Sequence, residues 1–124
     1  MSLTLTDQDK STLRTAAYGA VSLLAAATDS PHRVATQGSI ALASATGPIG
    51  HVLAAKSGDI NLYGKTVAEL ADQVLPALTA SVALLGPDAD DFRTTIQVAI
   101  EAATQGQDSP VLAEMSRKIT AALS

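Results

Sequence analysis

The sequence contains no cysteine and no tryptophan, and its aromatic residues are two tyrosines and one phenylalanine. Without cysteine there is no disulfide framework, no thiolate chemistry and no cysteine-ligated metal site. Because aromatic residues make up only 2% of the chain, a core must be built from alanine and aliphatic side chains. Abundant alanine beside few lysines is also typical of bacterial proteins encoded by high-GC genomes.

Charged residues are scarce as well, at 16% of the chain against about 25% in a typical soluble domain. The net charge is −4, and the eight lysines and arginines are scattered along the sequence. Nucleic-acid binding requires a basic face, so this class of function is disfavoured. The first ten residues lack a basic region followed by an apolar run, and no signal peptide is predicted. Together with the missing cysteines, this predicts a cytoplasmic protein.

One long stretch, Val34 to Ala55, has no Asp, Glu, Lys or Arg at all. Small residues recur in it every four positions, at Ala35, Ser39, Ala43 and Gly47. A helix would align these residues in a stripe beside Gly38, and a neighbouring backbone could then approach closely. We therefore predict that residues 34–55 form the buried central helix of the fold, broken at Gly47. A membrane span is disfavoured because the stretch is alanine-rich and carries several polar residues, glycines and a proline.

Helical periodicity and capping signals predict further helices around this centre. The predicted helices cover residues 7–28, 31–46, 48–56, 67–85, 88–105 and 110–123. N-caps are expected at Thr6, Ser30, Thr66 and Ser109. Pro76 lies inside the fourth helix and should kink it. The fold class is therefore all-α, a compact bundle of five or six helices in a single domain over residues 1–124, with residues 1–5 as a flexible leader.

The sequence also contains an internal repeat. Without gaps, Leu-Arg-Thr at 13–15 aligns with Phe-Arg-Thr at 92–94, and Asp-Ser-Pro at 29–31 recurs at 108–110. Both segments would be helical hairpins with the same loop spacing. The repeat suggests that the bundle contains two pseudo-symmetric helical hairpins.

Two local patterns resemble cofactor or metal sites but are incomplete. Residues 64–66 read Gly-Lys-Thr, the end of a phosphate-binding loop, but the position that requires the first glycine is Asp59. Asp88, Asp90 and Asp91 could attract a cation, but no glycine-bearing calcium loop accompanies them. Their position favours a role at the positive end of a helix. No cofactor and no metal is predicted.

His51 is the most promising single residue for a ligand site, because it follows a helix break beside an apolar surface. Histidine can act as a metal ligand or a general base. However, His51 has no partner at metal-binding spacing, so neither a metal site nor a catalytic residue is assigned. Tyr63 lies in a connection that could cover the same pocket. His51 and Tyr63 are therefore the predicted ligand-binding residues.

No pair of acid and base groups is placed by a recognisable spacing, so an enzyme is the less favoured interpretation. The scarcity of charge favours a self-associating or partner-binding module, most simply a homodimer that buries an apolar helix face. The predicted face belongs to the helix that ends at Leu85 or to the outer side of the first helix. The alternative is a helical bundle that binds a small molecule, with a pocket between Gly47–His51 and Asp59–Gly64.

Overall fold

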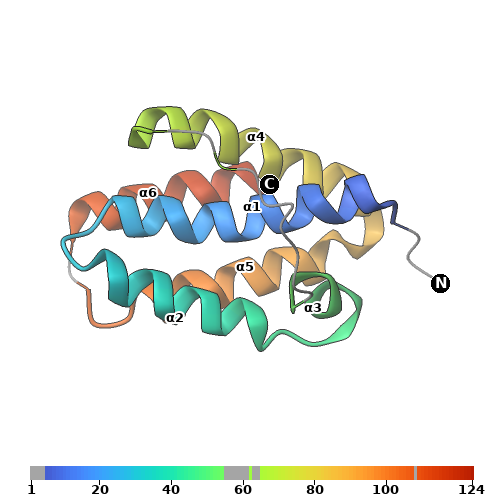
Figure 1. Ribbon diagram of the computed structural model, residues 1–124, viewed down its shortest axis with the longest axis horizontal. Coiled ribbons are helices and arrows are strands. Elements are labelled where there is room, and N and C mark those ends of the chain that lie inside the picture. Colours follow the sequence, from blue (N-terminus) through green and yellow to red (C-terminus); the bar gives the residue numbers. More distant parts are fainter. Residues whose placement is uncertain (1–4, 55–61, 63–64, 108) are drawn as a thin grey trace.

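The computed structural model describes residues 5–54, 62, 65–107 and 109–124, and in this part of the chain all regular structure is helical. The elements are α1 (Asp7–Ala26), α2 (Pro31–Ala43), α3 (Gly47–Ala54), α4 (Val67–Leu85), the short 3-10 helix η1 (Gly86–Asp88), α5 (Ala89–Thr104) and α6 (Pro110–Ala122). They pack side by side as a bundle (Figure 1). The predicted all-α bundle is confirmed.

Helix α1 is the centre of this bundle. It packs against α2, α3, α4, α5 and α6, and in Figure 1 it runs through the middle of the molecule, with α4 on one side and α2 on the other. Nine of its 20 residues are buried. Four of these nine are small, namely Ala16, Ala17, Gly19 and Ala20. Small side chains on several faces of α1 let the surrounding helices approach its backbone closely.

The prediction that residues 34–55 form the buried centre is wrong. In the structure, residues 34–54 lie at the edge of the bundle, in α2, α3 and the connection between them. Helix α2 buries Val34, Gly38 and Leu42. The predicted stripe of small residues does not face the core. Ala43 and Gly47 are exposed, and Ala35 and Ser39 are half-buried.

The physical reason is that a helix can lack charge without being buried. Thr36, Gln37 and Ser44 give the outer side of α2 its polarity without carrying charge. The close approach that was expected at the stripe occurs one row away, at Gly38. A Cβ atom added to Gly38 would lie 2.8 Å from Cγ1 of Val21 on α1.

Most predicted helix starts are confirmed in atomic detail. Thr6 forms the expected capping box, in which its hydroxyl accepts from the amide of Asp9 at 3.0 Å and its own amide donates to the Asp9 carboxylate at 3.1 Å. Thr66 and Ser109 each accept a hydrogen bond from the amide three residues later. Ser30 makes no such side-chain bond. Most predicted helices lose one to three residues at an end, and α4 continues through its internal proline.

The internal repeat is not confirmed in three dimensions. Arg14 on α1 and Arg93 on α5 are equivalent in the alignment and both donate to main-chain oxygens. However, the acceptor of Arg93, Leu123, aligns with Ser44 and not with Val52, the acceptor of Arg14. Burial does not follow the same alignment. Ile40 is 55% exposed whereas its equivalent, Ile119, is fully buried. The pseudo-symmetric duplication therefore stays a prediction.

Candidate functional site

Of the two residues predicted to bind a ligand, the structure describes His51, which is on α3 and has an exposed side chain. Tyr63 lies outside the described residues, as does the connection 59–64 except for Leu62. Within the described part of the chain, no group of three or more Asp, Glu or His side chains could hold a metal ion. A ligand site at His51 and Tyr63 therefore stays a prediction.

Two side chains of α1 fix α3 to the bundle. Arg14 donates from Nη1 to the main-chain oxygen of Val52 at 3.2 Å, and Tyr18 donates from its hydroxyl to the oxygen of Leu53 at 2.8 Å. Arg14 is only 7% exposed. Burial raises the pKa of the Tyr18 phenol above its usual value. Positions 14 and 18 share one face of α1, so together they bind the carbonyl end of α3.

The amphipathic character of tyrosine predicts that the Tyr18 hydroxyl lies at the edge of the core, but no sequence pattern indicates a role for Arg14. The available signal was a cation one residue after Leu13, on the apolar face of the first helix. Buried arginines are rare unless their hydrogen bonds are satisfied. An arginine in that position therefore indicates that carbonyl groups lie nearby, but it does not identify them.

The connection between α2 and α3 is tight and depends on glycine. Gly47 has a φ of +78°, a conformation that other residues rarely adopt. Three residues later, a Cβ atom on Gly50 would lie 2.2 Å from the main-chain oxygen of Ala45, so any side chain there would displace the backbone. These two glycines give residues 45–50 a fixed path along one side of a cleft.

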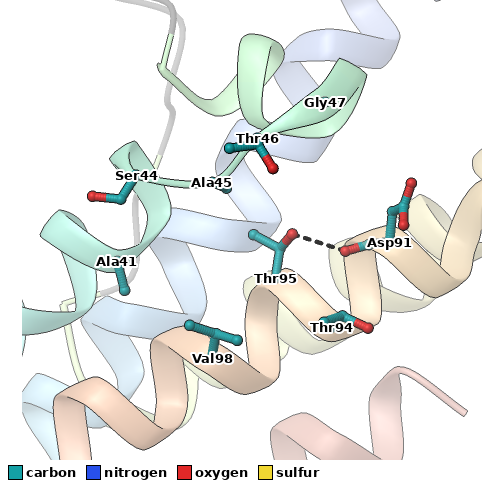
Figure 2. Close-up of a pocket in the computed structure, with 9 residues that line it drawn as sticks. All are labelled: Ala41, Ser44, Ala45, Thr46, Gly47, Asp91, Thr94, Thr95 and Val98. Carbon is teal, nitrogen blue, oxygen red and sulfur yellow. Dashed lines mark hydrogen bonds between the residues drawn. The ribbon is translucent and has the colours of Figure 1, made fainter.

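This cleft lies between the C-terminal end of α2, the connection to α3 and the N-terminal half of α5 (Figure 2). Its volume is about 420 Å³, within the range of roughly 300–1,000 Å³ usual for small-molecule sites. It is lined by Ala41, Ser44, Ala45, Thr46, Gly47, Asp91, Thr94, Thr95 and Val98. The cleft shares Gly47 with the predicted pocket, but His51 does not line it.

Two polar groups of the cleft, the Asp91 carboxylate and the Thr95 oxygen, can only accept hydrogen bonds, whereas the hydroxyls of Ser44, Thr46 and Thr94 can also donate. The Thr95 hydroxyl donates to the main-chain oxygen of Asp91 at 2.8 Å, which leaves its oxygen free to accept. Figure 2 shows the Thr46 hydroxyl pointing from the opposite wall toward Thr95. Among the described residues, nothing pairs with the Asp91 carboxylate, whereas Asp90 forms a salt bridge with Arg93 at 2.8 Å.

A second surface feature is the outer side of α4. From Gln73 to Pro87 the sequence contains no charged residue. The buried side of α4 carries Val74, Leu78, Ser81 and Leu85. The opposite side exposes Pro76, Ala80, Ala83 and Leu84, the last at 42%. The other predicted contact face, the outer side of α1, is polar and half-buried at Ser11, Thr12, Thr15 and Ser22.

This region has a high mean hydropathy although little of it is buried. Within Val67–Thr104, which covers α4, η1 and α5, an 18-residue window reaches a mean hydropathy of 1.3 while 22% of it is buried. By length and composition alone, this segment could cross a membrane, a criterion that core helices of soluble proteins also meet. The feature that needs an explanation is therefore apolar surface left uncovered on α4.

Comparisons with protein-family models, with curated proteins and with solved structures find no match to this chain.

Proposed function

We propose that this protein is a self-associating helical module that acts without catalysis, and that its homodimer forms through the outer side of α4. The observation that supports this proposal is the charge-free exposed surface of Pro76, Ala80, Ala83 and Leu84. Uncovered apolar area of this kind is more typical of an interaction face than of monomer surface. The proposal includes a cytoplasmic location, in keeping with the absence of cysteine.

A second copy is a better occupant of this face than a charged partner. A twofold dimer places the same patch on both sides of the interface, so a patch of one charge sign would repel itself. The exposed surface from Pro76 to Leu84 avoids this problem, whereas Glu69 and Asp72, nearer the start of α4, are exposed acids outside it. Ala80 and Ala83 are also small enough to let two α4 helices pack at the short interaxial distances of about 8 Å seen between such helices.

The test is the mass of the protein in solution and its response to one added charge. Sedimentation velocity or light scattering should give a dimer at micromolar concentration. Ala80→Glu should give a monomer, because two glutamates would face each other near the twofold axis and lose their hydration. Thr36→Glu on α2 is the matched control, since Thr36 is exposed on another helix, and this variant should remain dimeric.

Two results would contradict the proposal. One is a wild-type chain that stays monomeric across the micromolar range. The other is a wild-type chain that floats with neutral phosphatidylcholine vesicles while Ala80→Glu does not, because α4 would then be covered by lipid rather than by a second copy. Both experiments use the full chain and are independent of any small-molecule ligand.

A further inference from the structure

The cleft between α2 and α5 is lined by one carboxylate, several hydroxyls and apolar side chains. We infer that it binds a small organic cation, a primary amine with a short apolar body, with the ammonium group between Asp91, Thr46 and Thr95. This site is separate from the α4 surface, with which it shares no residue.

The charge that lines the cleft is negative. Of the nine described residues that line it, one is a carboxylate and none is Lys, Arg or His. The two acids nearest to Asp91 in the sequence make no such contribution, because Asp90 is paired with Arg93 and Asp88 does not line the cleft. The first turn of α5 attracts acidic residues in general, but only the Asp91 side chain contributes its charge to the cleft.

The hydrogen-bonding groups of the cleft match those of an ammonium group. An ammonium group has three donors and no acceptor. The Asp91 carboxylate can only accept, and the Thr95 oxygen is restricted to accepting because its hydrogen is donated to the main chain of Asp91 at 2.8 Å. The Thr46 hydroxyl, which has no hydrogen-bond partner among the described residues, points toward Thr95 from the opposite wall (Figure 2). The Asp91 carboxylate and the Thr95 oxygen, which can only accept, therefore line the same cleft as the Thr46 hydroxyl, which can accept as well as donate.

Apolar side chains line another part of the cleft. Ala41, Ala45 and Val98 provide methyl groups next to the acceptors, and Val98 is 50% exposed. In Figure 2, Ala41 and Val98 lie together at the end of the cleft away from Asp91. A ligand with an ammonium group at one end and a hydrocarbon body at the other matches this division. The volume of about 420 Å³ accommodates a single ring with a short side chain.

The experiment compares three probes of the same shape and different charge: 2-phenylethylamine, 2-phenylethanol and phenylacetate. Each is titrated into ¹⁵N-labelled protein, and amide shifts of Thr46, Gly47, Thr94 and Thr95 are followed. The amine should bind in the millimolar range, because its one ion pair is open to solvent. The alcohol should bind several-fold more weakly and phenylacetate least. Added salt should reduce the advantage of the amine.

Two variants test the assignment. Asp91→Asn should bring the affinity for the amine down to that for the alcohol, while Glu101→Gln, which removes an exposed charge farther along α5, should leave it unchanged. Preferential binding of phenylacetate would overturn the inference, since the amides at the start of α3 would then determine the ligand. So would amine-induced shifts confined to other parts of the molecule, or an equal response in both variants. The monomeric Ala80→Glu chain should still bind the amine, which separates this test from that of the dimer.

Discussion

Arg14 of α1 donates from a buried side chain to the main-chain oxygen of Val52, 3.2 Å away, in the last turn of α3. Helix α3 has eight residues, too few for a stable isolated helix. It is held by the buried side chains of Ile49, Val52 and Leu53 and by hydrogen bonds to its carbonyl end. A positive charge at that end also interacts favourably with the helix dipole.

Replacing this arginine should destabilise the fold and loosen α3. Arg14→Met retains most of the side-chain volume but leaves the Val52 oxygen without its charged donor, which should cost about 1–3 kcal/mol. Urea unfolding measures the loss, and hydrogen exchange should show that the amides of α3 lose protection before those of α1. Arg117→Met is the control, because Arg117 is exposed and paired with Glu114, and exposed pairs contribute only about 0–1 kcal/mol. Equal losses in both variants would argue against a special role for Arg14.

Tyr18 should make the stability of the protein fall at alkaline pH. Burial raises the pKa of its phenol in the folded state above the usual value of 10.0. Below pH 10 the phenol is protonated in both states and its contribution is complete. As the pH rises past that value, the unfolded chain loses the proton first, so the contribution decreases until the folded-state pKa is reached.

The relevant quantity is the difference in the free energy of unfolding between wild type and Tyr18→Phe, because contributions shared by the two proteins cancel in it. At pH 7 the variant should be about 1 kcal/mol less stable, since it loses the hydrogen bond to Leu53. This difference should shrink above pH 10. A difference that stays constant from pH 7 to pH 11 would contradict the raised pKa.

The sequence was sufficient to predict the features of this fold that depend on neighbouring residues. Helix caps, glycine stops and the periodicity of α5 depend on contacts within a few positions. Helical spacing predicts five inward-facing residues in α5, and all are buried: Phe92, Ile96, Ala99, Ile100 and Ala103. The same kind of pattern predicted the α4 boundary at Leu85 correctly. These features need no knowledge of which helices are adjacent.

Features that depend on distant segments could not be predicted in this way. The cleft combines residues near position 45 with residues near position 95, which no local pattern connects. The choice of central helix failed for a similar reason. Helices α1 and α2 both offer small residues at helical spacing, and the one that becomes central is the one that five neighbours can surround. Apolar spacing in residues 110–123 also predicts that Val111 faces inward, but it is 63% exposed whereas Leu112 beside it is buried.

The close contact between α1 and α4 should depend on Gly19. A Cβ atom there would lie 2.6 Å from Cγ2 of Val74, and a β-branched valine in a helix has little freedom to move away. Gly19→Ala should therefore destabilise the protein by about 1–3 kcal/mol, although alanine favours an exposed helix by about 1 kcal/mol.

A double-mutant cycle separates this clash from other effects of the alanine. Val74→Ala removes the two methyl groups that a new Cβ would meet. Combined with Gly19→Ala, it should cost clearly less than the sum of the two single changes, because the added methyl fills space that the valine vacates. Urea unfolding of the four proteins gives the coupling energy. Strict additivity would show that the two positions do not limit how closely α1 and α4 approach.

The location of the core can be tested with one substitution at two alanines. If residues 34–55 were the centre, Ala43→Leu would overpack it and cost roughly 1–3 kcal/mol. In the structure Ala43 is exposed, so the change should alter the free energy of unfolding by less than about 0.5 kcal/mol. Ala17→Leu on α1 should carry the larger cost instead, because Ala17 is fully buried.

Both variants are measured by urea unfolding at low and high protein concentration. A large cost for Ala43→Leu that appears only at high concentration would mean that α2, rather than α4, is covered in the dimer. A large cost at every concentration would mean that α2 lies inside the monomer, and the arrangement around α1 would be wrong.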